Sequence, residues 1–323
     1  MSRIYFDNAA TTPIDEEVQK VMVEAMAENY GNPSSIYAEG RKARAAIEQA
    51  RRKVAQHLGA SIGEIFFTSG GSESNNMVLK GAVRDLGVQR IISIPVEHHC
   101  NLHSFDSITR DMDAEVVMLK MDEKGLPDLE ELKRILPLSD KKTLVSFMHS
   151  NNETGCMIDL EEVAKICEEA GVLFHSDTVQ TIGYFPIDLS KTKMAFISGS
   201  AHKFYGPKGV GFVYISNDNI IKPLIDGGGQ ERNMRAGTES IHNILGLAKA
   251  VELAYDNLEE RKAVIIDLRQ TMIEQLQANF DDLEFNSPIE GGHYKVLSVS
   301  FPPSPKADLL LLNLDIAGIS VSG

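Results

Sequence analysis

From Glu64 onward, short apolar runs alternate with segments of helical periodicity, and this alternation constrains the fold more than any other feature. We expect strands at 65–68, 91–94, 116–119, 144–148, 172–175, 194–197 and 210–215, and helices at 72–86, 99–112, 128–136 and 159–170. Strands that are apolar throughout are typical of a sheet buried on both faces, and helical connections favour parallel neighbours. The sequence therefore predicts an α/β fold with a mostly parallel central sheet covered by helices.

The segments outside this alternation are expected to form an N-terminal arm and a second domain. Residues 4–13 suggest a brief strand and a turn, and a helical stretch over 240–280 has its expected interruption near Asn257. Beyond it we expect a strand at 296–301, a helix at 306–317 and the start of a strand at 319–322. We predict a large domain of residues 14–255 and a small α+β domain of residues 1–13 and 256–323, incomplete at Gly323.

Lys203 lies in a short polar loop, residues 198–209, between two expected strands. Ser200 and His202 are close to it in the sequence, and glycine and proline residues hold the loop in an exposed shape. A lysine held in this way suits Schiff-base chemistry with a phosphorylated carbonyl cofactor. The alternative is a surface lysine in a basic turn.

The segment 68–76 joins a strand to a helix and contains Gly70, Gly71 and Ser72 in succession. Glycine lets the backbone approach a ligand, and the free N–H groups at the start of the following helix attract an anion. We expect Gly71 and Ser72 to bind a phosphate, with a plain capped helix start as the alternative. The glycine spacing does not match the dinucleotide fingerprint, which argues against a nicotinamide cofactor.

Two further strand ends carry groups suited to a flat nitrogen-containing ring. Asp177 ends an apolar strand, where a carboxylate is costly without a cationic partner such as a protonated pyridine nitrogen. Adjacent residues such as His98, His99 and Cys100 do not by themselves make a tetrahedral metal site. His98, at the end of its strand, is better placed to lie flat over such a ring. The alternatives are that Asp177 and His98 merely cap the next segments. With the phosphate loop, an amide side chain and Lys203, these groups describe one ligand, pyridoxal 5′-phosphate.

Composition limits the class of protein. The formal net charge of −14 argues against non-specific binding to nucleic acid or to anionic lipid. No apolar run approaches membrane-spanning length, and the first residues do not resemble a signal peptide. Three cysteines in 323 residues indicate a reducing compartment rather than a disulfide scaffold. We expect a cytoplasmic protein with no membrane partner.

Motifs spread along the whole chain closely resemble those of the cysteine desulfurases, in particular the branch that serves iron–sulfur cluster and nitrogenase maturation. The motifs are YFDNAATTP, GNPSS, FTSGGSESNN, VEHHCN, HSNNETG, HSDTVQTIG, SGSAHKFYGPKGVG and GGGQERNMRAGT. The resemblance implies a fold-type I pyridoxal-phosphate enzyme of the class V aminotransferase-like group. Ser72 stands where the family commonly has threonine, and Tyr37 where it commonly has histidine.

The resemblance also implies a role for each candidate site residue. Lys203 would form the Schiff base, Asp177 would pair with the pyridine nitrogen, and His98 would stack on the ring and share proton transfer. The remaining cofactor-binding positions implied are Gln180 and Asn152 near the ring oxygen, Ser72, Ser200 and His202 at the phosphate, and Thr238 at the phosphate of a neighbouring subunit. The last of these implies a homodimer with shared sites.

The reaction implied is the conversion of L-cysteine to L-alanine. The sulfur would leave as an enzyme persulfide for an acceptor protein, such as an iron–sulfur scaffold, or for tRNA thiolation. Two alternatives remain open. One is another class V activity, an aminotransferase or a selenocysteine lyase, and the other is a catalytically silent scaffold with the same fold.

In the family, the nucleophilic cysteine lies on a mobile loop just after the last expected strand, and the substrate-binding arginine lies further on. Neither position falls within residues 1–323, and Cys100, Cys156 and Cys167 do not match the nucleophile. We therefore expect the native chain to continue past Gly323, with a cysteine within about ten residues.

Overall fold

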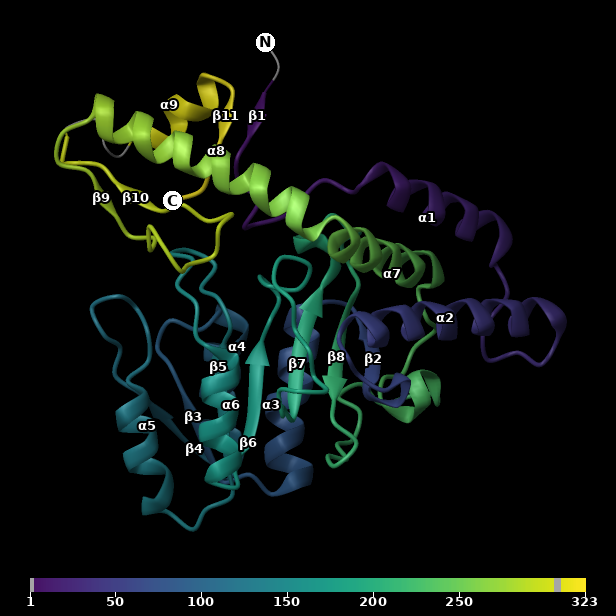
Figure 1. Cartoon of the computed structure of the whole chain (residues 1–323). Helices are drawn as coiled ribbons and strands as arrows, with labels where there is room; N and C mark the ends of the chain where they lie inside the picture. The colour runs from purple at the N-terminus through teal and green to yellow at the C-terminus, as the bar shows by residue number, and fades with distance from the viewer. Residues whose placement is uncertain (1–2, 305–308) are drawn as a thin grey trace.

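The computed structural model describes residues 3–304 and 309–323, and a seven-stranded sheet lies at its centre (Figure 1). The strands lie in the order β2-β8-β7-β6-β5-β3-β4. β8 is antiparallel to both of its neighbours, and every other pair in this sheet is parallel. The predicted α/β architecture is therefore confirmed. The bounds are Ile65–Thr68 (β2), Arg90–Ser93 (β3), Glu115–Met118 (β4), Thr143–Met148 (β5), Leu173–Asp177 (β6), Phe196–Ser200 (β7) and Gly211–Ile215 (β8).

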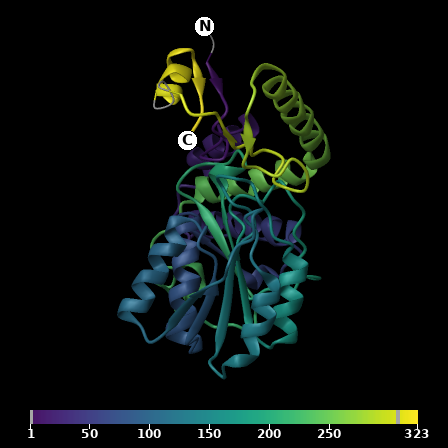
Figure 2. The ribbon, with the colours of Figure 1, turned by 90° about the vertical axis from the view of Figure 1, so that its left-hand side faces the viewer.

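Helices cover both faces of this sheet (Figures 1 and 2). Side chains along a strand alternate between the faces, so Phe66 packs in one core cluster and Phe67 in the other. The Phe66 cluster contains residues of α3 (Gly71–Leu86) and α4 (His99–Asp111). The Phe67 cluster contains residues of α1 (Glu16–Glu28), α2 (Ala38–His57), α5 (Leu129–Ile135), α6 (Leu160–Glu169) and α7 (Ile241–Asp256). Burial on both faces explains why the strands are apolar throughout.

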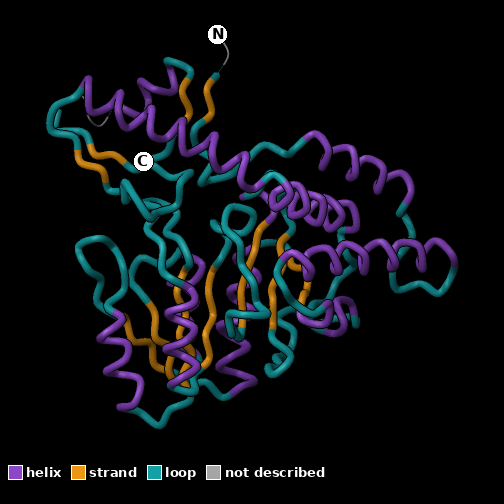
Figure 3. Tube along the Cα trace, in the orientation of Figure 1, coloured by secondary structure: helices purple, strands orange, loops and turns teal. Residues whose placement is uncertain are grey.

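The predicted long helix over 240–280 is two helices, α7 and α8 (Leu258–Asn279), and the break lies at Asn257 as expected. Asn257 has φ −107° and ψ 20°, outside the helical region, and its side-chain amide donates to the carbonyl of Leu253. α8 leads away from the central sheet toward the C-terminal elements (Figure 3).

The elements beyond α8 are shorter than the sequence suggests. The strand expected at 296–301 is reduced to β10 (Val299–Ser300), which pairs with β9 (Glu284–Phe285), and Pro302 and Pro303 remove the N–H groups that would extend it. α9 spans Leu310–Ile316, and residues 306–308 of the predicted helix lie outside the described residues.

The two ends of the chain meet in a second small sheet. β11 (Ile319–Ser320), expected as a strand, pairs in parallel with β1 (Ile4–Tyr5), and the two lie side by side in Figures 1 and 2. The division into residues 14–255 against 1–13 and 256–323 stays a prediction. Within residues 3–304 and 309–323, no helix combines the length and the apolar character needed to cross a membrane.

Candidate active site

Sheet register brings three predicted loops to one edge. Gly211, the first residue of β8, pairs with Thr68 at the end of β2 and with Ser200 at the end of β7. Because β6 pairs in parallel with β7, Asp177 at the end of β6 lies at this same edge. Polar groups that are far apart in the sequence therefore converge where ligands of α/β sheets bind.

The start of α3 forms a close-packed cradle. Gly70 has φ +151°, a conformation that favours glycine, and a Cβ at Gly71 would lie 2.6 Å from Cγ2 of Val179. The position of a Cβ on Gly70 lies 3.5 Å from Oγ of Ser200. Among the described residues, nothing accepts a hydrogen bond from the N–H groups of Gly71, Ser72 or Glu73. Free N–H groups and the helix dipole suit a phosphate.

His202 stands beside this cradle in a 3-10 turn, residues Ala201–Lys203, that follows β7. Its Nδ1 lies 3.2 Å from Oγ1 of Thr11, and its carbonyl accepts from the N–H of Thr12. Burial, followed by the charge of Lys203, lowers the pKa of His202 to about 4. The imidazole is therefore neutral at pH 7 and can donate one hydrogen bond to an anion.

Lys203 ends the 3-10 turn and points at the N-terminal arm. Its Nζ donates to the carbonyls of Ala9 at 2.6 Å and Ala10 at 2.8 Å. Burial lowers the pKa of Lys203, and the nearby carboxylates of Asp177 and Asp7 partly oppose that shift. A lysine whose amine is neutral more often than usual is suited to nucleophilic and basic chemistry.

Asp177 is a buried carboxyl held by hydrogen bonds rather than by an ion pair. Oδ1 accepts from the N–H of Val179 at 3.0 Å, and Oδ2 accepts from Nδ2 of Asn75 at 2.6 Å. Burial raises the pKa of Asp177, while these donors and the charges of His98 and Lys203 oppose the rise. No described cation contacts the carboxyl, so it has the capacity to pair with a cationic ring nitrogen.

His98 is the N-cap of α4, so the capping alternative is correct as a structural description. Its Nδ1 accepts from the N–H of Cys100 at 3.1 Å. That bond lies in the plane of the imidazole, so it does not itself block stacking on a ring face, and the ring of His99 lies nearby in an edge-to-face arrangement. Burial lowers the pKa of His98, against the charge of Asp177. The cap orients the ring and places the remaining proton on Nε2.

The structure brings the other predicted residues together only in part. Nε2 of Gln180 donates to the carbonyl of Ala9 at 3.0 Å, and its Oε1 is buried without a described partner. Asn152 is half-exposed, and no hydrogen bond of its side chain occurs among the described residues. Thr238 is exposed in a groove of about 340 Å³ beside residues 29–33, and it contacts none of the other candidates within the described part of the chain.

Three contributors to the site were not predicted from the sequence. The Ala9 and Ala10 carbonyls hold Lys203, Asn75 holds Asp177, and Glu97 is a buried carboxyl beside His98. Asn75 lies four residues after Gly71 in α3, one helical turn along the same face, and that spacing could have marked it. Backbone carbonyls carry no such sequence signal.

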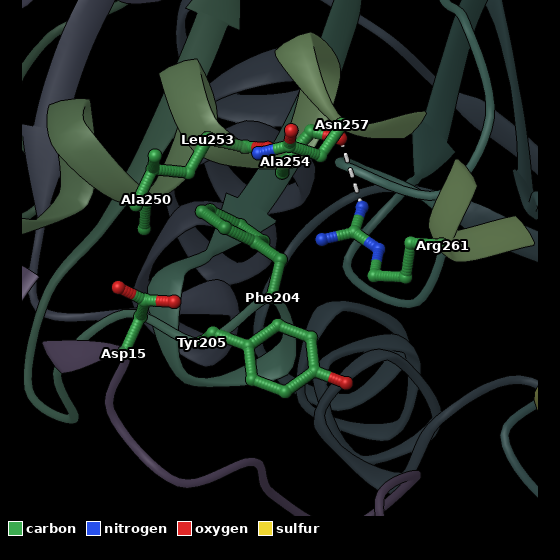
Figure 4. A pocket seen from close by; sticks show the side chains of 8 residues that line it. All are labelled: Asp15, Phe204, Tyr205, Ala250, Leu253, Ala254, Asn257 and Arg261. Carbon is green, nitrogen blue, oxygen red and sulfur yellow. Dashed lines mark hydrogen bonds between the residues drawn. The ribbon is translucent and has the colours of Figure 1, made fainter. Parts of the chain in front are cut away.

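A cavity of about 240 Å³ lies behind the turn that carries Lys203 (Figure 4). Tyr205, Asn257 and Arg261 are among its lining residues, and the dashed line in Figure 4 marks the bond from Arg261 to the carbonyl of Ala254. Arg261 also donates to the carbonyl of Gly183. The guanidinium thereby ties the start of α8 to the loop after β6.

The donor set fits pyridoxal 5′-phosphate. The cradle offers free N–H groups to a phosphate, Asp177 offers a carboxyl to a ring nitrogen, and Oε1 of Gln180 is a buried polar atom that still has hydrogen-bonding capacity. No group of three or more His, Cys, Asp or Glu residues suited to a metal ion occurs among the described residues.

Known proteins resemble this chain over nearly its whole length. The aminotransferase class-V family matches residues 4–323. A protein named cysteine desulfurase IscS from Dictyoglomus turgidum is 40% identical over 99% of this chain and 80% of its own length. A solved structure titled "NIFS-LIKE PROTEIN" superposes with a TM-score of 0.94 at 39% identity, covering 99% of this chain and 87% of that one. A structure titled "SspA in complex with cysteine" gives a TM-score of 0.83 at 30% identity, covering 99% and 88% of the two chains.

Proposed function

Because this chain belongs to the aminotransferase class-V family and, within it, to the cysteine desulfurases, we propose that it converts L-cysteine to L-alanine. The sulfur is transferred as an enzyme persulfide to an acceptor protein, for iron–sulfur cluster assembly or for tRNA thiolation. The family depends on pyridoxal 5′-phosphate, and the residues of this site suit that cofactor.

Bound pyridoxal 5′-phosphate supplies an electron-accepting ring at the substrate Cα. Asp177 would hold the ring nitrogen in its protonated state, and His98 would pack against the ring. The phosphate is held by Gly71, Ser72, Ser200 and His202, and the ring oxygen by Gln180 and Asn152. Asp177, whose carboxyl is held by hydrogen bonds before the cofactor binds, would lower the entropic cost of orienting the ring.

Lys203 holds the cofactor and moves the substrate proton. Its amine donates to the carbonyls of Ala9 and Ala10, so the N-terminal arm fixes the direction in which the Lys203 side chain points. Because burial lowers its pKa, a larger fraction of the amine is neutral at pH 7 and can accept a proton from the substrate Cα.

His98 is the second proton carrier. Its Nδ1 accepts from the N–H of Cys100, so the neutral ring carries its proton on Nε2, and Nε2 is the nitrogen that can give a proton. With a pKa below the usual value, the ring releases a gained proton readily and returns to the same tautomer.

Two further parts of the proposal concern partners and location. Thr238, which lies apart from the other candidates, serves the phosphate site of a second copy in a homodimer. A cytoplasmic location agrees with the low cysteine content of the chain, although one relative, from Trachipleistophora hominis, is named a mitosomal cysteine desulfurase.

One observation carries the proposal most directly. Asp177 and Lys203 come from neighbouring strands and lie at one sheet edge, and the buried carboxyl has no described cationic partner. An unpaired buried carboxyl costs stability, and a ring that brings a cationic nitrogen offsets that cost.

Product analysis tests the function. The complete protein, loaded with pyridoxal 5′-phosphate, is given L-cysteine and a thiol reductant, and amino and keto acids are quantified. We expect L-alanine and sulfide in equal amounts. A keto acid in place of alanine would assign an aminotransferase instead, and turnover of selenocysteine but not of cysteine would assign a lyase.

A further inference from the structure

A largely buried series of hydrogen bonds starts at Asp177. Nδ2 of Asn75 donates to Oδ2 of Asp177 at 2.6 Å and also approaches Sγ of Cys100 at 3.4 Å. The Cys100 thiol in turn donates to Oδ1 of Asn101 at 3.7 Å, a long but acceptable distance for sulfur. Asn75 and Asn101 are fully buried, and Cys100 between them is half-buried.

The series of hydrogen bonds ends at Glu97. Nδ2 of Asn101 donates to Oε2 of Glu97 at 2.7 Å, and the backbone N–H of Met148 donates to the other carboxyl oxygen. Met148 is also the register partner of Asp177 across β5 and β6. The network therefore runs from the end of β6, through residues near the starts of α3 and α4, to Glu97, which the end of β5 holds through the N–H of Met148.

Nδ2 of Asn75 donates both ways, to Asp177 and to Cys100, and from Cys100 onward each donor points toward Glu97. Both asparagine amides give N–H groups toward a carboxyl, and the Cys100 thiol gives its proton to Asn101. Oδ1 of Asn75 is buried and has no described partner. Turning the amide over would place this oxygen against the carboxyl of Asp177, so the amide keeps its N–H groups toward Asp177. Burial raises the pKa of Cys100 to about 11, so the thiol keeps the proton that it donates.

We propose that the Asn75–Cys100–Asn101–Glu97 network positions Asp177 and keeps it ionised against the ring nitrogen of the cofactor. Cys100 is a positioning residue in this network, because its hydrogen bond with Asn75 supports the amide that holds Asp177. The other charged groups that face Asp177 are His98 and Lys203. This inference depends on the proposed role of Asp177 as the partner of the ring nitrogen.

The test compares Cys100→Ala, which breaks the network, with Cys100→Ser, which can still accept and donate. We expect Cys100→Ala to bind pyridoxal 5′-phosphate about fivefold more weakly, as for the loss of one hydrogen bond. The pH midpoint at which the absorbance of the bound chromophore changes should also rise in this variant. A less ionised Asp177 keeps the ring nitrogen less protonated, so the ring withdraws fewer electrons from the titrating group. Cys100→Ser should restore both values.

Cys167→Ala is the control, since it also removes a cysteine sulfur but lies in the core on α6, outside the network. Cys167→Ala should leave affinity and midpoint unchanged. If Cys100→Ala behaves like wild type, or Cys167→Ala produces the same shifts, the network has no such role.

Asn101→Ala interrupts the network from the other side and should reproduce the effects of Cys100→Ala. Wild-type protein that bound no pyridoxal 5′-phosphate would instead overturn the proposed function. An unchanged Cys100→Ala in a wild type that does bind it would overturn only this inference.

Discussion

Glu97 lowers the stability of the folded protein when it ionises. Burial, together with the charge of Asp177, raises its pKa from 4.5 to about 8. The folded state therefore binds a proton that the unfolded state has lost in this range, and the unfolding free energy falls as pH rises, by at most about 1.4 kcal/mol per pH unit. Glu97→Gln cannot ionise. We expect its stability advantage over wild type to grow across this range and to level off above about pH 8.

The measurement is urea denaturation of the cofactor-free protein between about pH 5 and pH 9. Glu123→Gln, at an exposed loop position, is the matched control and should track wild type at every pH. If the unfolding free energies of wild type and Glu97→Gln differ by the same amount at every pH, Glu97 does not titrate as described.

At this scale, the sequence allows the residues at strand ends to be predicted but not their partners. Asp177, His98 and Lys203 follow apolar runs, so their location at one sheet edge follows from the topology. Glu97, which Asn101 also holds, meets the N–H of Met148 only after β3 and β5 pair. Such contacts depend on strand order, which the sequence pattern does not reveal.

The first turn of α3 depends on the absence of a side chain at Gly71. Since a Cβ there would lie 2.6 Å from Val179, Gly71→Ala forces a shift of α3 against the loop after β6. We expect a loss of about 1–3 kcal/mol in unfolding free energy. We also expect weaker binding of pyridoxal 5′-phosphate, because the N–H groups of the cradle move.

Gly63→Ala is the control for that substitution, since the nearest atom to its Cβ would be 3.7 Å away. Gly63→Ala should change the unfolding free energy measured in urea only slightly. The variant should bind the cofactor as wild type does. Equal losses in both variants would show that the cradle has no special packing requirement.

At the level of elements, long and strongly patterned segments are predicted well and short ones poorly. The α7–α8 break at Asn257 has a local cause in that residue's backbone and amide. β10 is short because two prolines follow it closely, whereas the pairing of β1 with β11 joins residues more than 300 positions apart. Local patterns cannot specify a pairing over that distance.

For the whole molecule, the exposed position of Thr238 leads to a prediction about assembly. The loop that carries it is anchored by Glu231, which makes two hydrogen bonds to the buried guanidinium of Arg51 and one to the N–H of Phe67. We expect a homodimer in which Thr238 of one copy completes the phosphate site of the other. Mixing Lys203→Ala subunits with Thr238→Ala subunits should then restore one intact site per heterodimer.

Cofactor binding to the mixture, compared with each variant alone, reports that restoration. Sedimentation should show a dimer before and after mixing. A monomer that binds pyridoxal 5′-phosphate fully would rule out shared sites.

The identity of the lysine that binds the cofactor tests the central claim most directly. Protein loaded with pyridoxal 5′-phosphate is reduced with borohydride and digested, and the modified peptide is identified by mass. Lys208, exposed in the same loop, provides the control variant Lys208→Ala. We predict that the reduced adduct lies on Lys203, persists in Lys208→Ala and is lost in Lys203→Ala. An adduct that survives in folded Lys203→Ala protein, or that lies on another lysine in the wild type, would contradict the account.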